Sequence, residues 1–253
     1  MSGAVNGARV VIHSGADVLA AAAAARLITR LTDLQAAGGT PRIALTGGGV
    51  GIGMLEQIRA APARDAVDWA RVEFFWGDER FLPPGDPERN ETQARAALLD
   101  HVPVDPAKVF PMGADTGTGP DGAEAAAADY AALLAGSPRD PLFDVVLLGM
   151  GEEGHTASVF PDSPAVHETT RTVVDVHDCP KPPPTRVSLT LATIRRSAEV
   201  WLVTAGAGKA PAVAAALGGA AEVDVPVAGA VGAERTLWLI DRAAASELPG
   251  HRA

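Results

Sequence analysis

A histidine and a carboxylate stand close together in one glycine-rich stretch of the sequence. Residues 149–156 read Gly-Met-Gly-Glu-Glu-Gly-His-Thr, which puts His155 two positions after Glu153. A neighbouring carboxylate is a common way to orient the imidazole of a general base. A loop histidine is more often structural, so this stretch by itself leaves both interpretations open. The chemical interpretation assigns proton transfer to His155 and its orientation to Glu153.

The same stretch has the spacing Gly-x-Gly-x-x-Gly, which is typical of dinucleotide-binding turns, with Asp175 about 20 residues further on. Two glutamates inside the turn would repel a pyrophosphate. Pro161 and Pro164 also prevent a long helix from following the turn. We therefore reject dinucleotide binding at this position.

A second glycine-rich turn, formed by Thr46, Gly47, Gly48 and Gly49, lies between a predicted strand and a predicted helix. Glycines let a ligand approach the backbone closely, and the first N–H groups of a helix bind anions. No Gly-Lys-Ser/Thr follows, so this is not a nucleotide-binding loop of the Walker type. It is either a phosphate-binding turn or a tight connection that binds nothing.

Charged residues directly follow another predicted strand. The sequence Trp-Gly-Asp-Glu-Arg places Asp78 and Arg80 where that strand ends. Ligands of α/β proteins bind at the carboxyl ends of strands, so these two side chains are candidates for binding and catalysis. The alternative is a solvated charged cluster. Further along, Asn90 is predicted to cap a helix rather than to contact a ligand.

Two cations complete the candidate site. Arg186 begins a short predicted strand, and Lys209 begins a predicted helix, where a phosphate is readily bound. The other two lysines of the chain are Lys108 and Lys181. We interpret both as surface residues that contribute to solubility.

Short apolar strands alternate with alanine-rich helices along the chain. In strands such as Phe143–Leu148 consecutive residues are apolar, so both faces of the sheet are expected to be covered. This pattern predicts an α/β fold with three αβα layers, a mainly parallel, Rossmann-like central sheet, and a single domain over residues 1–253. A small additional β element near residues 171–190 is predicted to contain the strand Arg186–Leu189. The other predicted strands are Arg9–His13, Arg42–Leu45, Val72–Trp76, Val200–Thr204 and Thr236–Ile240, and the helices are Ala16–Ala37, Val50–Ala60, Glu91–Leu99, Ala123–Ala135 and Gly208–Leu217.

Composition and charge argue against several classes of protein. The 253 residues carry 21 Lys+Arg against 31 Asp+Glu, and the net charge of −10 disfavours binding to nucleic acids or anionic membranes. One cysteine excludes a disulfide framework and fits a reducing compartment. We find neither an apolar run of the ~20 residues that span a membrane nor a secretory signal, so we expect a cytoplasmic protein. Gly-x-Ser-x-Gly and His-Glu-x-x-His are missing, which argues against serine and zinc hydrolases.

Five stretches together resemble the 6-phosphogluconolactonase family, within the glucosamine-6-phosphate isomerase/6-phosphogluconolactonase superfamily. They are Leu45–Gly49, Phe75–Phe81, Phe143–Pro161, Pro182–Thr190 and Val200–Ala210. The resemblance follows the family's order over nearly the whole chain. It implies hydrolysis of 6-phosphoglucono-δ-lactone to 6-phosphogluconate in the oxidative pentose phosphate pathway. It also implies the fold of the glucosamine-6-phosphate deaminases and a reaction without a metal or an organic cofactor.

With this resemblance, the candidate residues receive roles in lactone hydrolysis. His155 is expected to activate water as the general base, with Glu153 and Asp78 orienting the imidazole and the water. Arg80 is expected to stabilise the oxyanion. The family usually has Asp where this chain has Glu153, so the carboxylate here reaches further by one methylene. The residues expected to bind the phosphate are Thr46, Gly47, Gly48, Gly49, Arg186 and Lys209.

Two other functions stay open. A glucosamine-6-phosphate deaminase would share the fold, but that family typically has Asp-Glu-Tyr and His-Ile-Ala-Phe-Asn where this chain has Arg80 and Thr156-Ala157-Ser158. A sugar-phosphate-sensing domain would bind the same ligand without reacting, since a fold alone does not fix a function. In each case the partner is a phosphorylated small molecule, and we expect a monomer or a weak dimer.

Overall fold

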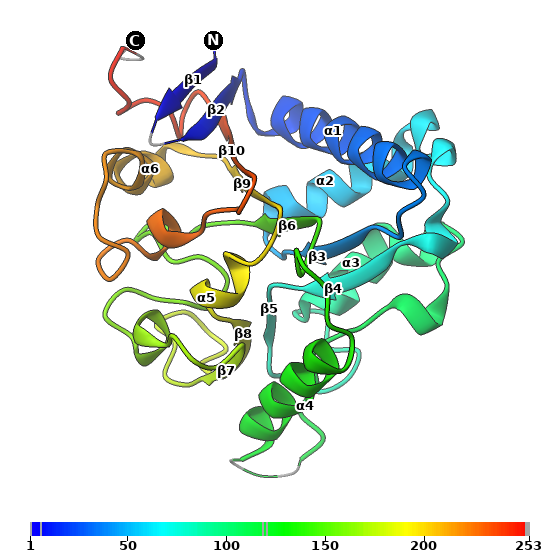
Figure 1. The fold of residues 1–253 in the computed structure, drawn as a ribbon. Coiled ribbons are helices and arrows are strands. Elements are labelled where there is room, and N and C mark those ends of the chain that lie inside the picture. The colour runs from blue at the N-terminus through cyan, green and yellow to red at the C-terminus, as the bar shows by residue number, and fades with distance from the viewer. Residues whose placement is uncertain (1, 6, 118, 120, 251–253) are drawn as a thin grey trace.

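A seven-stranded sheet runs through the centre of the molecule (Figure 1). The computed structural model describes residues 2–5, 7–117, 119 and 121–250. The strands of the main sheet are β1 (Ser2–Val5), β2 (Ala8–His13), β3 (Arg42–Leu45), β4 (Glu73–Trp76), β6 (Val145–Leu148), β9 (Glu199–Thr204) and β10 (Arg235–Asp241). Their order is β1-β2-β10-β9-β6-β3-β4, and all neighbours are parallel except β1 and β2. Loops that follow parallel strands therefore meet at one edge of the sheet.

Helices cover both faces of this sheet. They are α1 (Ala16–Ala36), α2 (Gly49–Ala60), α3 (Asn90–Ala97), α4 (Gly122–Gly136), α5 (Leu191–Ile194) and α6 (Ala210–Leu217). Figure 1 shows α1 beside α2, on the other side of the sheet from α6. None of the helices in the described part of the chain has the length and apolar character needed to cross a membrane.

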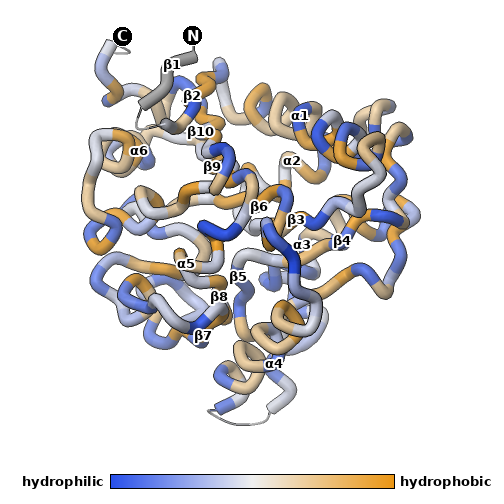
Figure 2. The backbone as a smooth tube through the Cα atoms, in the orientation of Figure 1, coloured by the Kyte–Doolittle hydropathy of each residue, from blue (hydrophilic) through white to orange (hydrophobic). Residues whose placement is uncertain are grey.

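Strand β6 shows how the sheet is buried on both faces. Val145 and Leu147 belong to the core beneath α1 and α2, whereas Val146 and Leu148 belong to the core shared with α4 and α6. All four side chains are buried. The prediction of a three-layer α/β fold with a mainly parallel sheet is therefore confirmed. Figure 2 shows the mixed hydropathy of α1, which packs one side on the sheet and exposes the other.

A second, smaller sheet confirms the additional β element expected near residues 171–190. Its strands are β5 (Asp78–Arg80), β7 (Val173–Val176) and β8 (Arg186–Leu189), and they are antiparallel in the order β5-β8-β7. Strand β5 was not among the strands predicted from the sequence; its three residues are all charged, and such residues are not typical of a strand. Pairing of β5 with β8 puts Arg80 opposite Arg186. Residues that are far apart in the chain thereby meet beside the carboxyl edge of the main sheet.

Candidate active site

Two adjoining cavities, of about 150 and 340 Å³, lie among the loops that follow β3, β4, β6 and β9. The two cavities share Gly47, Gly48, Gly149 and Met150 as lining residues. The smaller cavity is also lined by Thr46, Asp78, Arg80, Asn90, His155, Ala157 and Arg186. Glycine-rich and charged segments from four loops thus surround one composite site.

His155 and Glu153 form a hydrogen-bonded pair at the smaller cavity. His155 Nδ1 lies 2.9 Å from Glu153 Oε1, and Lys181 Nζ donates a hydrogen bond of 2.9 Å to Glu153 Oε2. A carboxylate only accepts hydrogen bonds, so the neutral imidazole carries its proton on Nδ1 and is basic at Nε2. The side chain of Glu153 thus reaches the imidazole and a lysine at the same time.

The surroundings of this pair set its protonation state. Burial lowers the pKa of His155 below its ordinary value of 6.5, although Glu153 acts in the opposite direction. Burial by itself would raise the pKa of Glu153, but hydrogen bonds from its own backbone N–H, from Lys181 and from His155 lower it to about 2. Near pH 7, His155 is therefore a neutral base and Glu153 is an anion.

The turn that carries this pair is held by its own contacts. The Gly151 N–H donates to the His155 carbonyl at 2.9 Å, and Thr156 Oγ1 donates to the Gly149 carbonyl at 2.9 Å. A Cβ atom at Gly151 would overlap His155 Nδ1, so only glycine lets the imidazole fold back over the turn. The ring of Phe160 packs on the imidazole with 4.4 Å between the ring centroids. These contacts restrict the position of the imidazole.

Asp78 lies in the same cavity with a different set of partners. Its Oδ2 accepts a hydrogen bond of 2.6 Å from Ser158 Oγ and lies 3.9 Å from Arg186 Nη1. Asn90 Nδ2 donates to the Asp78 carbonyl at 2.8 Å. Within the described residues, the hydrogen bonds of the Asp78 carboxylate come from Ser158 and Asn90 and not from His155. Glu153 therefore orients the imidazole, and Asp78 is placed to hold a water molecule or a substrate hydroxyl.

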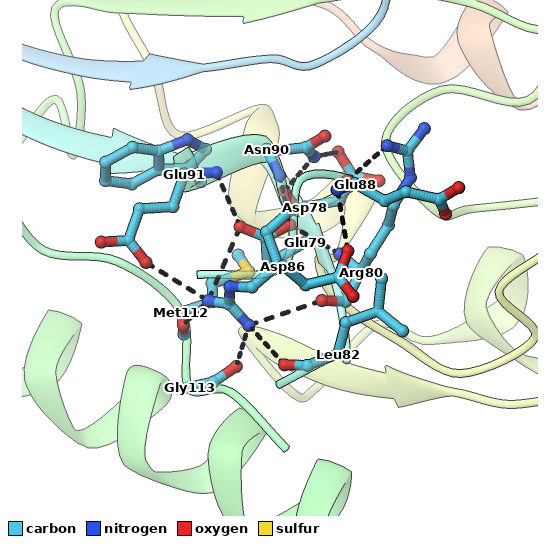
Figure 3. A network of polar contacts seen from close by, with 12 residues as sticks. Asp78, Glu79, Arg80, Leu82, Asp86, Glu88, Asn90, Glu91, Met112 and Gly113 are labelled. Carbon is cyan, nitrogen blue, oxygen red and sulfur yellow. Dashed lines mark hydrogen bonds and ion pairs between the residues drawn. The ribbon is translucent and has the colours of Figure 1, made fainter. Parts of the chain in front are cut away.

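Glu79, the middle residue of β5, joins that strand to α3. Its carboxylate accepts hydrogen bonds of 2.8, 2.7 and 2.9 Å from the backbone N–H groups of Arg80, Asn90 and Glu91. Figure 3 shows these contacts at the first turn of α3. The Arg89 side chain is only 1% exposed, and its Nη2 lies 3.7 Å from Glu79 Oε2. The buried network fixes β5 and so positions the charged residues on either side of Glu79.

Two arginines from the paired strands β5 and β8 border the smaller cavity. Arg186 donates from Nε and Nη2 to the carbonyls of residues 181–183 at 3.1 to 3.3 Å. Arg80 Nη1 donates to the Glu88 carbonyl, and its buried Nε has no partner among the described residues. Both guanidinium groups therefore keep N–H donors for an anionic ligand.

The larger cavity contains Lys209 and the turn that begins α2. Gly48 has a φ of 81°, which favours glycine, and a Cβ atom at Gly47 would overlap Asn90 Oδ1. Thr204 also lines this cavity, and its buried hydroxyl has no hydrogen-bond partner among the described residues. A cation, an unpaired hydroxyl and a helix N-terminus together suit a phosphate.

Comparisons with known proteins identify the family. The family model for glucosamine-6-phosphate isomerases/6-phosphogluconolactonase matches residues 14–238. The chain belongs to this family. A 6-phosphogluconolactonase from Streptomyces coelicolor is 55% identical over 247 residues, which cover 95% of each chain. Another from Mycobacterium tuberculosis is 52% identical over 244 residues, which cover 95% of this chain and 98% of the relative.

Solved structures of the glucosamine-6-phosphate isomerase/6-phosphogluconolactonase family share the fold. The 6-phosphogluconolactonase of Trypanosoma brucei has a TM-score of 0.83 at 27% identity and covers 97% of this chain and 100% of its own. A monomeric glucosamine-6-phosphate deaminase has a TM-score of 0.77 at 22% identity and covers 94% of this chain and 98% of its own. At that identity, the second likeness concerns the fold alone.

The candidate residues selected from the sequence gather at this composite site. Those that border the smaller cavity are Thr46, Gly47, Gly48, Asp78, Arg80, His155 and Arg186. Gly49 and Lys209 line the larger cavity. Glu153 lines neither of these two cavities and contacts the site through its hydrogen bond to His155.

Two interpretations from the sequence are wrong, and one residue was missed. Asn90 is not a cap: α3 begins with it, and its side chain donates to Asp78 and borders the cavity. Lys181 is not merely a solubilising residue, because it forms an ion pair with Glu153. Ser158 was not selected as a site residue from the sequence, yet it donates to Asp78 across 80 positions of the chain. Such long-range contacts leave no local pattern in the sequence.

Proposed function

We propose that this chain hydrolyses 6-phospho-D-glucono-1,5-lactone to 6-phospho-D-gluconate in the oxidative pentose phosphate pathway. Relatives with 55% and 52% identity are named 6-phosphogluconolactonase. The observation that supports the chemistry best is the 2.9 Å contact between His155 Nδ1 and Glu153 Oε1 at a cavity bordered by arginines. This arrangement offers an oriented base to an anionic substrate. A cytoplasmic location, which the single cysteine favours, is part of the proposal.

The first step is attack of water on C1 of the lactone. Nε2 of His155 takes one proton from the water as its oxygen bonds to C1, and the carbonyl oxygen becomes an oxyanion. Asp78 orients the water. Arg80 and the N–H groups of the surrounding loops donate to the oxyanion, and each such donor is typically worth a few kcal/mol.

The second step breaks the bond between C1 and the ring oxygen. The imidazolium of His155 returns its proton to this oxygen, which leaves as the C5 hydroxyl. The C1 carbonyl forms again, and the resulting carboxylic acid releases its proton to solvent. Glu153 stabilises the imidazolium between the two steps, because its carboxylate stays ionised.

The phosphate of the substrate is assigned to the turn at the start of α2. Gly47 and Gly48 line both cavities, so a phosphate above them has Lys209 on one side and Arg186 on the other. The first N–H groups of α2 add further donors. Local cations are needed in a chain with a net charge of −10, whose overall field repels anions.

The direct test measures how fast the lactone disappears near neutral pH. The lactone is generated in situ from glucose 6-phosphate, spontaneous hydrolysis is subtracted, and glucosamine 6-phosphate is assayed in parallel. We expect acceleration with the lactone and no conversion of the amino sugar. Conversion of glucosamine 6-phosphate alone would contradict the proposal and indicate a deaminase. Product binding without turnover of either compound would contradict it and indicate a sensor.

Lys181→Met is expected to move the acid limb of the kcat/KM profile to higher pH. The positive charge of Lys181 lowers the pKa of His155, so its removal raises that pKa and the base is protonated sooner as the pH falls. We expect kcat to fall by about fivefold or less, because a half-exposed ion pair is worth about 1 kcal/mol or less. Lys181→Arg keeps the charge and should restore the wild-type profile. If the acid limb of Lys181→Met lies at the same pH as that of the wild type, Lys181 does not lower the pKa of His155.

A further inference from the structure

A hollow of about 390 Å³ lies between α1 and the amino ends of β9 and β10. Its lining includes Arg26 and Arg30 from α1 and Arg235, the first residue of β10. Strand β9 begins here at Glu199 and ends at Thr204 beside the active site. At about 3.3 Å per residue, a six-residue strand separates the two places by about 17 Å. A ligand in the hollow would therefore leave the active site open.

Glu199 is the buried carboxylate beside this hollow. Its side chain is 3% exposed and accepts a hydrogen bond of 2.8 Å from Trp201 Nε1. Arg30 Nε lies 3.0 Å and Arg235 Nη1 lies 3.7 Å from its two oxygens. The Glu199 carboxylate thus forms ion pairs with Arg30 and Arg235. Each guanidinium has five N–H donors, so each keeps donors that do not contact Glu199.

Arg26 adds a further positive charge to this hollow. It is half-buried and has no hydrogen bond or ion pair within the part of the chain that the structure describes. Burial, followed by the charges of Arg9 and Arg235, lowers the pKa of Arg26, while Glu199 opposes this shift. The other carboxylate at the hollow is that of Asp33, which is exposed. Cations therefore outnumber carboxylates here, in a chain that is strongly acidic overall.

We propose that this hollow is a second anion site, which binds a small molecule through a phosphate or diphosphate group. A guanidinium donates parallel N–H groups to phosphate oxygens and stays charged at all physiological pH values. Arg26 and Arg30 are four positions apart and so lie on one side of α1, and Arg235 borders the hollow from the sheet. Ala22 and Ala25 line the same side and leave room for the ligand.

Inorganic pyrophosphate serves as the probe, and the indole N–H signal of Trp201 in an NMR titration serves as the local readout. Trp201 lines the hollow and donates to Glu199, so ligand binding there shifts this signal. We expect a saturable shift at physiological ionic strength, unchanged in Lys209→Met, which alters the active site instead. The Arg26→Gln, Arg235→Gln double variant should bind at least tenfold more weakly by this signal.

Arg196→Gln is the matched control, because Arg196 is exposed and does not line the hollow. It should leave the titration unchanged, and the double variant should keep the wild-type rate of lactone hydrolysis. The proposal is overturned if the Trp201 signal stays constant while signals from the active-site loops shift. It is also overturned if the double variant titrates like the wild type.

Discussion

His155→Ala is expected to lower kcat by about 10²–10⁴-fold, the usual contribution of a general acid–base group. Product affinity should stay near that of the wild type, because the phosphate contacts lie on other loops. The measurement combines steady-state lactone hydrolysis, corrected for the spontaneous reaction, with calorimetric titration of the product. Thermal unfolding of the variant establishes that the fold is intact.

The pH profile supplies a second readout for His155. Its burial lowers the pKa of the imidazole, so the acid limb of kcat/KM should lie below 6.5, the ordinary value. Activity is lost as the pH falls through this pKa, because the imidazolium cannot accept a proton from water. In His155→Ala the limb should disappear from the residual rate.

His177→Ala is a close control for this experiment. His177 also follows a carboxylate by two positions, and its Nε2 lies 3.0 Å from Asp175 Oδ2. It is exposed and borders neither of the two active-site cavities. We expect wild-type kcat for this variant. Nearly full turnover in His155→Ala, or an equal loss in His177→Ala, would exclude His155 as the base.

Lys209→Met is expected to raise KM by about 10- to 100-fold with little change in kcat. A hydrogen bond to a charged group contributes about 1.5–3 kcal/mol, and the proposed bond from Lys209 to the phosphate is the same in the ground state and the transition state. Steady-state kinetics with the lactone provide the test. A variant with unchanged KM and lowered kcat would place Lys209 at the reacting carbonyl.

Lys108→Met makes the same chemical change away from the site. Lys108 is half-buried, and its Nζ donates to the Ala70 carbonyl at 2.8 Å. The KM of Lys108→Met should equal that of the wild type. Since both variants lose one positive charge, a raised KM in Lys209→Met alone would result from the loss of the local contact and not from the change in net charge. Arg186 is less suited to this comparison, because it also holds the carbonyls of residues 181–183.

Much of the main sheet could be predicted from local patterns. In β6, four consecutive apolar residues indicate a strand that is covered on both faces, and the structure divides them between two cores. The glycines at 47 and 48 indicate a tight turn before a helix, as observed at α2. Strand β5 could not be predicted in this way, because charged residues rarely form strands. In the structure, the backbone N–H groups of Asn90 and Glu91 donate hydrogen bonds to the buried carboxylate of Glu79 and so compensate for its burial.

The parts of the site that could not be predicted all depend on distant residues. Lys181 contacts Glu153 across 28 positions, and Ser158 contacts Asp78 across 80. The antiparallel pairing of β5 with β8 brings Arg80 opposite Arg186. None of these contacts follows from the spacing of residues along one helix or strand.

The sequence by itself determined the α/β pattern, the loops that carry chemistry, and the pairing of His155 with a carboxylate two positions away. These features are local, since side-chain periodicity, turn chemistry and a two-residue spacing act over a few positions. Only the tertiary structure decided that Lys181 donates a hydrogen bond to Glu153. It also decided that the Asp78 carboxylate accepts a hydrogen bond from Ser158 and makes none with His155. The reason is physical: the register of the small sheet and the path of the loops fix those distances, and both result from packing over the whole chain.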